Sequence, residues 1–197
     1  MLTMILTLTL SPSLDKTYVV EGLHQDRLNY ASKHVLLPGS KGINVSRMLS
    51  TLAIPNIAIG LCGGTMGKLL EQLLTMENVK FDFVETESEI RFNVKIADIV
   101  NNTFTDVNEH GEKVSDLEFE DLIALYTKHL EEASHVVIAG SIREGMPSNI
   151  YNTFIQIAKE HGKKVLFDCS GESLKFAIGE KPYLISPNIH ELSDYAG

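Results

Sequence analysis

The stretch that decides the fold is Leu37-Pro-Gly-Ser-Lys-Gly-Ile-Asn-Val-Ser-Arg-Met-Leu49, a glycine-containing turn that runs directly into an amphipathic helix. Gly39 and Gly42 permit backbone angles that other residues avoid, and they let a ligand approach the main chain closely. Lys41 and Asn44 add a cation and an amide near the helix N-terminus, where free N–H groups and the helix dipole favour an anion. The turn therefore predicts an anion site, with an ordinary strand-to-helix turn and a solvated lysine as the alternative.

The spacing of these glycines excludes two common nucleotide-binding loops. It is not G-x-x-x-x-G-K-[ST], so the stretch is not a P-loop. It is not G-x-G-x-x-G either, so a Rossmann dinucleotide site has no support here.

Length and composition limit the class of protein. The 197 residues fit one α/β domain, with room for a small appendage. A net charge of -9 without a basic cluster argues against a nucleic-acid-binding surface. Cys62 and Cys169 lie in apolar surroundings without zinc-ligand spacing, which predicts reduced core thiols in a cytoplasmic protein. Residues 1–10 are apolar but too short to span a bilayer and lack a basic leader region, so we expect a buried strand and no membrane partner.

Short apolar strands alternate with amphipathic helices along most of the chain. This rhythm predicts a mostly parallel sheet flanked by helices, with the polar residues at the carboxyl ends of the strands around one crevice. Asp15, just past the first strand, could accept hydrogen bonds from substrate hydroxyls there, or it could cap a turn. We expect the strands of this sheet at 4–10, 57–62, 135–139, 164–167 and 183–185, and helices at 41–52, 63–76, 116–130, 148–161 and after 171.

Two parts of the chain do not follow this alternation and predict a small β lid, at about 16–37 and 79–107. Its expected strands are 18–21, 32–37, 79–84, 90–99 and a return strand at 103–107. The second part carries Arg91, Asn93 and Lys95 at alternate positions, so their side chains share one face of a strand. These polar groups could contact a phosphate or a sugar. The alternative is that these side chains lie on the solvent-exposed face of an edge strand.

Six short motifs occur together in order and cover essentially the whole chain. They are Ser11-Pro-Ser-Leu-Asp15, Pro38-Gly-Ser-Lys-Gly-Ile-Asn-Val45, Arg91-Phe-Asn-Val-Lys95, Ala139-Gly-Ser141, Asp168-Cys-Ser-Gly-Glu172 and Pro187-Asn-Ile-His-Glu191. In this combination they closely resemble the ribokinase-like (PfkB) sugar kinases, in particular the branch that contains 1-phosphofructokinase and tagatose-6-phosphate kinase.

The resemblance implies a Rossmann-type α/β fold with a β lid that often serves as a dimer clasp, so a homodimer through the lid is expected. It also implies transfer of the γ-phosphoryl group of ATP to a sugar hydroxyl with Mg²⁺. The resemblance implies that Arg91 binds the phosphate already on the substrate. A dianionic phosphate that binds to a chain of net charge -9 needs a nearby positive charge to offset the repulsion. The implied sugar-phosphate site comprises Asp15, Gly39, Lys41, Asn44, Arg91 and Ser141.

The resemblance places the nucleotide side of the site near the end of the chain. Asn188 and Glu191 match the family's N-x-x-E motif, which acts on the metal and on the nucleotide phosphates, and Ser186 lies next to it. Oxygen ligands with retained waters are what Mg²⁺ prefers. The implied metal ligands are therefore Asn188 and Glu191.

One family motif is missing from the 197 residues. No G-A-G-D occurs, although its aspartate is the general base of the family, so no catalytic residue is assigned. We expect 1–197 to be the N-terminal part of a kinase domain, truncated before the C-terminal nucleotide-binding part and nearly inactive alone.

Three positions depart from the family pattern. Ser40 stands where a second glycine is usual, Ser186 where many relatives have a lysine, and Tyr30 where an arginine is common in the lid. These changes bear on lid closure, nucleotide affinity and substrate choice.

The expected function is phosphorylation of a ketohexose phosphate, fructose 1-phosphate to fructose 1,6-bisphosphate. The segment Thr105-Asp-Val-Asn-Glu-His-Gly111 and the Arg-x-Asn-Val-Lys strand favour this substrate. Two alternatives stay open: a tagatose-6-phosphate kinase, and a non-catalytic protein that binds sugar phosphates.

Overall fold

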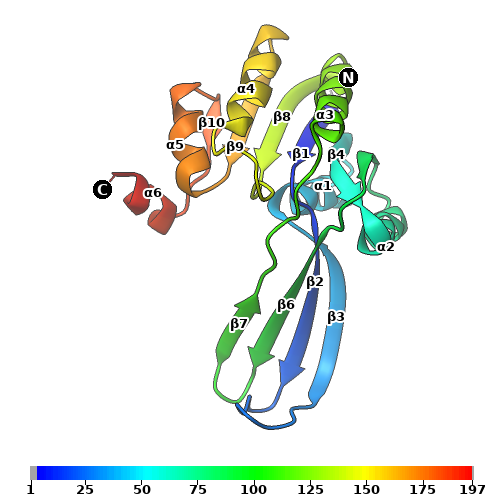
Figure 1. Cartoon of the computed structure of the whole chain (residues 1–197), viewed down its shortest axis with the longest axis vertical. Helices are drawn as coiled ribbons and strands as arrows, with labels where there is room; N and C mark the ends of the chain where they lie inside the picture. The colour runs from blue at the N-terminus through cyan, green and yellow to red at the C-terminus, as the bar shows by residue number, and fades with distance from the viewer. Residues whose placement is uncertain (1–3, 197) are drawn as a thin grey trace.

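The computed structural model describes residues 4–196, which form an α/β body and a β lid that extends away from it (Figure 1). The body is built on a six-stranded sheet in the order β10-β9-β8-β1-β4-β5, and every neighbouring pair is parallel. Its strands are β1 (Met4–Thr9), β4 (Asn56–Gly63), β5 (Phe81–Thr86), β8 (Ala133–Ala139), β9 (Lys164–Asp168) and β10 (Leu184–Ile185).

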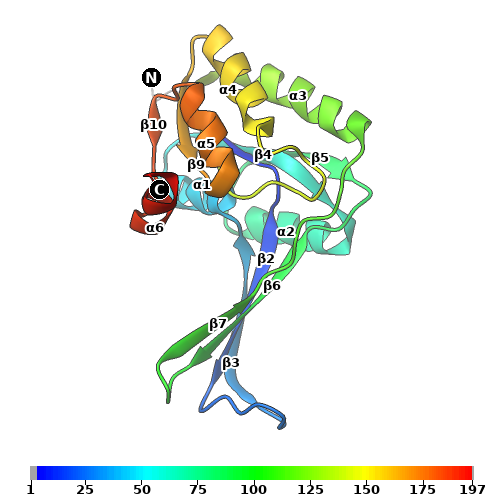
Figure 2. The same ribbon diagram turned by 60° about the vertical axis from the view of Figure 1, so that its left-hand side comes forward.

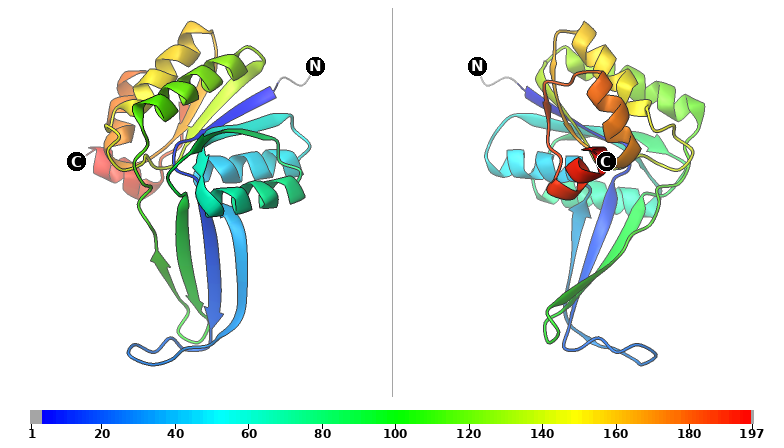
Figure 3. Two further views of the ribbon diagram at one scale, coloured as in Figure 1. Left: turned by 45° about the vertical axis from the view of Figure 1, so that its right-hand side comes forward. Right: turned by 90° about the vertical axis from the view of Figure 1, so that its left-hand side faces the viewer.

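Helices cover both faces of this sheet (Figure 3). One core lies between the sheet and α3, α4 and α5, and a second lies between the opposite face and α1 and α2. The sixth helix, α6, follows β10. The bounds are α1 (Lys41–Thr51), α2 (Gly64–Met76), α3 (Asp116–Leu130), α4 (Ile150–Glu160), α5 (Gly171–Gly179) and α6 (Ile189–Ala196).

The central strand β1 shows why the sequence folds in two layers. Successive side chains of a strand point to opposite faces, so Leu6 and Leu8 enter the core under α3 and α4. Thr7 points to the other face, where its hydroxyl lies 2.6 Å from the hydroxyl of Ser46 on α1. Fully buried polar groups need such partners, and this pair ties α1 to the middle of the sheet.

Glycine at position 42 lets α1 approach the sheet closely. A Cβ at Gly42 would overlap the hydroxyl of Thr9 and lie 3.1 Å from the carbonyl oxygen of Leu8. The N-terminus of α1 is therefore held against the carboxyl end of β1, where the sequence predicts an anion site.

The lid is a separate four-stranded sheet, which Figure 2 shows extending away from the body. Its strands follow the order β3-β2-β6-β7, as seen in Figure 1. Its two inner strands, β2 and β6, are parallel, and each outer strand is antiparallel to its neighbour. β2 starts only four residues after β1 ends, so the chain passes directly from the central strand of the body into the lid. The bounds are β2 (Ser13–Val20), β3 (Ala31–Gly39), β6 (Arg91–Asp98) and β7 (Thr103–Val107).

Two expectations about the lid are corrected by these strands. Its first hairpin is longer than 16–37, since β2 begins at Ser13 and β3 ends at Gly39. Residues 79–86 are not part of the lid, because β5 pairs in parallel with β4 at the edge of the main sheet. The second lid segment therefore begins at Arg91.

The far end of the lid is organised by Asp98, at the end of β6. Its carboxylate accepts hydrogen bonds from the backbone N–H groups of Gly22 (3.0 Å), Leu23 (2.7 Å) and Val100 (3.1 Å). These bonds, with those from Asn101, hold the pKa of Asp98 far below its ordinary value. The carboxylate thus joins two turns far apart in the sequence.

Two predictions from composition can be compared with the described residues. Cys62 and Cys169 are both free and buried, as expected for core thiols. Within residues 4–196, we find no helix that combines the length and the apolar character needed to cross a bilayer.

Candidate active site

A cavity of about 420 Å³ lies where the lid meets the body. Five of the six residues predicted for the sugar-phosphate site line it: Asp15, Lys41, Asn44, Arg91 and Ser141. They come from β2, α1, β6 and the loop after β8, so segments distant in the sequence meet at one place. The remaining lining residues are Ser13, Ser40, Asn93, Lys95, Asp106, Asn108, Gly140, Cys169 and Ser170.

Gly39, the sixth predicted residue, does not line the cavity, but its lack of a side chain leaves space for the side chains of Asp15 and Ser13. A Cβ there would overlap the carboxylate of Asp15 and lie 2.5 Å from the hydroxyl of Ser13. The unusual backbone angles expected at these glycines are not found, because neither Gly39 nor Gly42 has a positive φ. Both are needed for close packing, and the positive φ lies at Ser40 between them.

Asp15 is the centre of a hydrogen-bond network in the cavity. Its Oδ1 accepts from Ser13 Oγ (3.0 Å) and from Asn93 Nδ2 (2.9 Å), and its Oδ2 lies 2.9 Å from Lys95 Nζ. Burial alone would raise the pKa of Asp15, but the bonds from Lys95, Asn93 and Ser13 outweigh it and lower the pKa. The carboxylate is therefore ionised at neutral pH and accepts hydrogen bonds only.

Arg91 lies at the start of β6, on the same face as Asn93 and Lys95. The alternative of a wet edge strand is wrong, because β6 lies between β2 and β7 and these side chains line the cavity. Arg91 Nη2 donates to the carbonyl oxygen of Ser11 (2.8 Å), while its buried Nε has no partner among the described residues. Such a half-satisfied guanidinium can bind a further acceptor.

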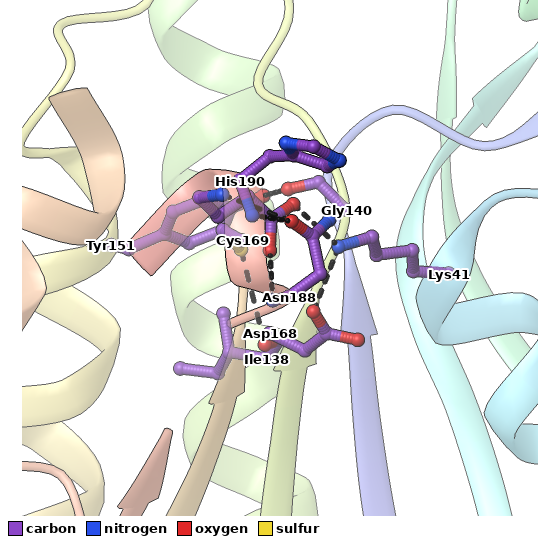
Figure 4. Close-up of polar contacts among 9 residues, drawn as sticks. Lys41, Ile138, Gly140, Tyr151, Asp168, Cys169, Asn188 and His190 are labelled. Atoms are coloured by element: carbon purple, nitrogen blue, oxygen red, sulfur yellow. Dashed lines mark hydrogen bonds and ion pairs between the residues drawn. The ribbon is translucent and has the colours of Figure 1, made fainter. Parts of the chain in front are cut away.

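Lys41 connects the cavity to the end of the chain (Figure 4). From the first turn of α1, its Nζ lies 2.8 Å from Asp168 Oδ1 and 3.4 Å from Glu191 Oε1. Burial would lower the pKa of Lys41, but these carboxylates raise it above its ordinary value. The alternative of a solvated lysine is therefore wrong, because Lys41 is ion-paired. Half-exposed pairs of this kind contribute little to stability.

Asn188 and Glu191 lie together at the N-terminus of α6 and cap it. Asn188 Oδ1 accepts from the N–H groups of His190 and Glu191, each at 2.9 Å, and Glu191 Oε2 accepts from the Asn188 N–H at 2.9 Å. Like Ser186, neither of them lines the cavity. Lys41 joins Glu191 to the cavity through its 3.4 Å contact.

The oxygens at this helix end fit a magnesium ion in part. Glu191 Oε1 is engaged only by the long 3.4 Å contact to Lys41, so it can turn to a cation, whereas Asn188 Oδ1 already accepts two N–H groups. No group of three or more acidic, histidine or cysteine ligands occurs in the part of the chain that the structure describes. A donor set this small suits Mg²⁺, which keeps several waters and also binds substrate phosphates.

Ser40 has an unusual backbone conformation at the edge of the cavity. Its φ of 84° and ψ of 145° lie in a region that is essentially reserved for glycine. Its hydroxyl is buried without a hydrogen-bond partner among the described residues and faces Gly140, where a Cβ would lie 3.0 Å away. Serine is therefore strained at the position where the resembled family has glycine.

We expect Ser40→Gly to raise the free energy of unfolding by about 1 kcal/mol, because it relieves the strained φ and removes an unsatisfied hydroxyl. Ser40→Ala keeps the Cβ and so tests the hydroxyl alone, with a smaller gain expected. Urea denaturation of the three proteins measures both effects. A Ser40→Gly variant that is less stable than its parent would contradict this account.

Several residues of the site lie within the quoted motifs but are not among the predicted site residues. Ser13, Asp106, Asn108 and Ser170 line the cavity, and Asp168 pairs with Lys41. The register of β6 and β7, which places Asp106 opposite Lys95, is the signal that brings Asp106 to the cavity face. No pattern in the sequence indicates that Lys41 turns toward Asp168.

Comparison with known proteins agrees with this arrangement. Residues 9–197 match the profile of the pfkB family carbohydrate kinase. The chain is 36% identical over 194 residues to a 1-phosphofructokinase of Bacillus subtilis, covering 98% of this chain and 63% of that protein. This chain thus spans less than two thirds of the relative's length.

Solved structures give the same result for the fold. A possible 1-phosphofructokinase of Thermotoga maritima superposes with a TM-score of 0.89 at 34% identity, covering 95% of this chain and 61% of that one. Phosphofructokinase-2 of Escherichia coli in complex with fructose-6-phosphate gives a TM-score of 0.89 at 29% identity, covering 98% and 64%. By its sequence profile, its relatives and its fold, this chain belongs to the pfkB family of carbohydrate kinases.

Proposed function

We propose that this chain carries the sugar-phosphate half of an ATP-dependent ketohexose-phosphate kinase that converts fructose 1-phosphate to fructose 1,6-bisphosphate. One observation carries the proposal: a single cavity between lid and body holds an ionised aspartate, Asp15, and a partly unsatisfied arginine, Arg91. A sugar phosphate offers hydroxyl donors for the first and an anion for the second.

Each residue has a distinct part in this proposal. Asp15 accepts hydrogen bonds from sugar hydroxyls and orients the ring, and Arg91 binds the phosphate through its free donors. Lys41, which already faces Asp168 and Glu191, lies between this cavity and the residues proposed for the nucleotide side. When bound near Glu191, Mg²⁺ would offset the negative charge of the ATP phosphates.

The names of the relatives support the reaction class and favour the substrate. Two curated relatives, from Bacillus subtilis and Borreliella burgdorferi, are named 1-phosphofructokinase, each 36% identical to this chain. Tagatose 6-phosphate also carries a phosphate that Arg91 could hold, so it is the alternative substrate. The free buried thiols Cys62 and Cys169 support a cytoplasmic location.

We also propose a homodimer through the lid. The face of the lid that lines the cavity also carries apolar side chains that are exposed: Val35, Leu37 and, with 76% of its surface exposed, Phe104. A neighbouring lid packed against this face would bury them and cover the cavity.

Calorimetric titration tests the binding half of the proposal on the 197-residue chain. We expect binding of fructose 1-phosphate and weaker binding of unphosphorylated fructose. Turnover with ATP and Mg²⁺ is measured on the product of the complete reading frame, with tagatose 6-phosphate as the competing substrate. Faster turnover of tagatose 6-phosphate would show that this sugar phosphate, and not fructose 1-phosphate, is the substrate. Binding of a sugar phosphate without turnover would show that the protein binds sugar phosphates and is not a kinase.

A further inference from the structure

Arg143 is a fully buried cation outside the cavity. It lies in the loop between β8 and α4, two residues after Ser141, and only 2% of its surface is exposed. No carboxylate of residues 4–196 lies within ion-pair distance of it. Because a buried charge without a counter-ion is costly, its position calls for a physical reason.

The guanidinium of Arg143 joins three segments. Its Nε donates to the carbonyl oxygen of Leu10 (3.0 Å), its Nη2 to that of Leu61 (2.7 Å) and its Nη1 to the hydroxyl of Ser88 (2.9 Å). Leu10 follows β1, Leu61 lies near the end of β4, and Ser88 belongs to the loop between β5 and β6. Arg143 thus ties together the carboxyl ends of β1 and β4 and the loop between β5 and β6.

Two of these three segments lead to Arg91. Leu10 precedes Ser11, whose carbonyl oxygen accepts the hydrogen bond from Arg91 Nη2. Ser88 lies three residues before Arg91, in the loop that leads into β6. Arg143 therefore holds both the backbone that carries Arg91 and the residue next to its acceptor.

The neighbourhood of Arg91 has polar groups that an anion could engage. Arg91 Nε and Ser11 Oγ are both buried and without partners in the described part of the chain. Arg91 and Arg143 donate to the carbonyl oxygens of two neighbouring residues, Ser11 and Leu10, so the two cations are near each other. Among the described residues, no carboxylate lies within ion-pair distance of either guanidinium group, although Asp15 and Glu118 act on them from farther away. A dianionic phosphate beside Arg91 would balance the two positive charges.

We propose that Arg143 is a positioning residue. It holds Arg91 in place, and its own positive charge strengthens the attraction of Arg91 for the phosphate group of the substrate. This inference rests on the proposed sugar-phosphate site. The competing explanation is that Arg143 only joins β1 to β4. In that case its removal would lower stability without moving Arg91 or changing the affinity for phosphate.

The first measurement follows Arg91 itself and needs no ligand. The Nε–H resonance of Arg91 is recorded by ¹⁵N NMR and assigned with Arg91→Lys. We expect Arg143→Met, and to a smaller extent Ser88→Ala, to shift this resonance and speed its exchange with solvent. Lys68→Met removes an exposed charge on α2 and is the matched control, with no shift expected.

The second measurement is affinity, with inorganic phosphate and fructose 1-phosphate as probes. Arg143→Met should weaken both by about tenfold or more, since a charged partner is lost, and Arg143→Lys should recover part of this loss. Ser88→Ala should weaken both by about threefold, the size of effect expected for one neutral hydrogen bond. Lys68→Met should bind as its parent does.

The outcomes separate this proposal from the function on which it rests. A folded Arg143→Met variant with an unmoved Arg91 resonance and unchanged phosphate affinity overturns the inference. If that variant does not fold, Ser88→Ala and Arg143→Lys decide by the same criteria. A parent chain that binds inorganic phosphate through Arg91 but no sugar phosphate contradicts only the proposed function, and one that binds neither overturns both.

Discussion

Alanine at position 60 is expected to destabilise the protein by about 3 kcal/mol or more, the upper part of the range for overpacked sites. Gly60 lies on β4 directly opposite Thr9 of β1. A Cβ there would overlap the carbonyl oxygen of Thr9, which is backbone and cannot rotate away. The change must therefore push apart β1 and β4, two neighbouring strands of the main sheet.

Thermal and urea denaturation measure this effect. Gly179→Ala, at the end of α5, is the matched control, because nothing lies within 4 Å of the position where its Cβ would be. We expect that control to stay within about 0.5 kcal/mol of the parent. A Gly60→Ala variant as stable as Gly179→Ala would show that β1 and β4 do not pack in this register.

Most of the body could be predicted from the sequence, because buried strands and amphipathic helices leave strong periodic signals. The helix predicted over 41–52 is confirmed as α1 (Lys41–Thr51), and the return strand at 103–107 is confirmed as β7. Each of these segments alternates or repeats with a clear period; Gly39 precedes α1, and Asn102 and Asn108 flank β7. Local signals were sufficient there.

The boundary of the lid could not be predicted in the same way. β5 has an alternating pattern that suits either sheet, and its membership depends on pairing with β4, a tertiary contact. β2 begins at Ser13 because Arg91 and Gly39 lie opposite it, although Ser13 and Asp15 are poor strand formers. Pairing partners, which the sequence does not reveal locally, decided both cases.

In the candidate site, too, local patterns could be predicted from the sequence and long-range contacts could not. Arg91, Asn93 and Lys95 share a face by strand periodicity alone, and the sequence predicts that face correctly. The contacts of Lys41 with Asp168 and of Arg143 with Leu10 join residues more than 100 positions apart. An arginine in a loop flanked by glycines gives no local sign that it is buried.

Changing Asp15 to asparagine is expected to have the largest effect on ligand binding. The amide keeps the shape of the side chain but places an NH₂ group or a neutral oxygen opposite Lys95, and it has fewer acceptor sites for sugar hydroxyls. Two hydrogen bonds to a charged group, at about 1.5 kcal/mol each, correspond to a loss of about 100-fold in affinity for fructose 1-phosphate. Calorimetry measures this loss.

Two further measurements show whether the Asp15 carboxylate acts by its position or only by its charge: the affinity of a matched variant, Asp106→Asn, and the acid unfolding of Asp15→Asn. Asp106→Asn removes the same charge from the same cavity, and we expect a much smaller loss of affinity. The native pKa of Asp15 is below its ordinary value of 3.8, so the stability from its ionised form is present above that pH and is lost as the pH falls below it. Asp15→Asn should therefore unfold less steeply with acid in that range. Equal losses of affinity in both variants, with unchanged acid unfolding, would mean that general negative charge, and not the network around Asp15, binds the sugar.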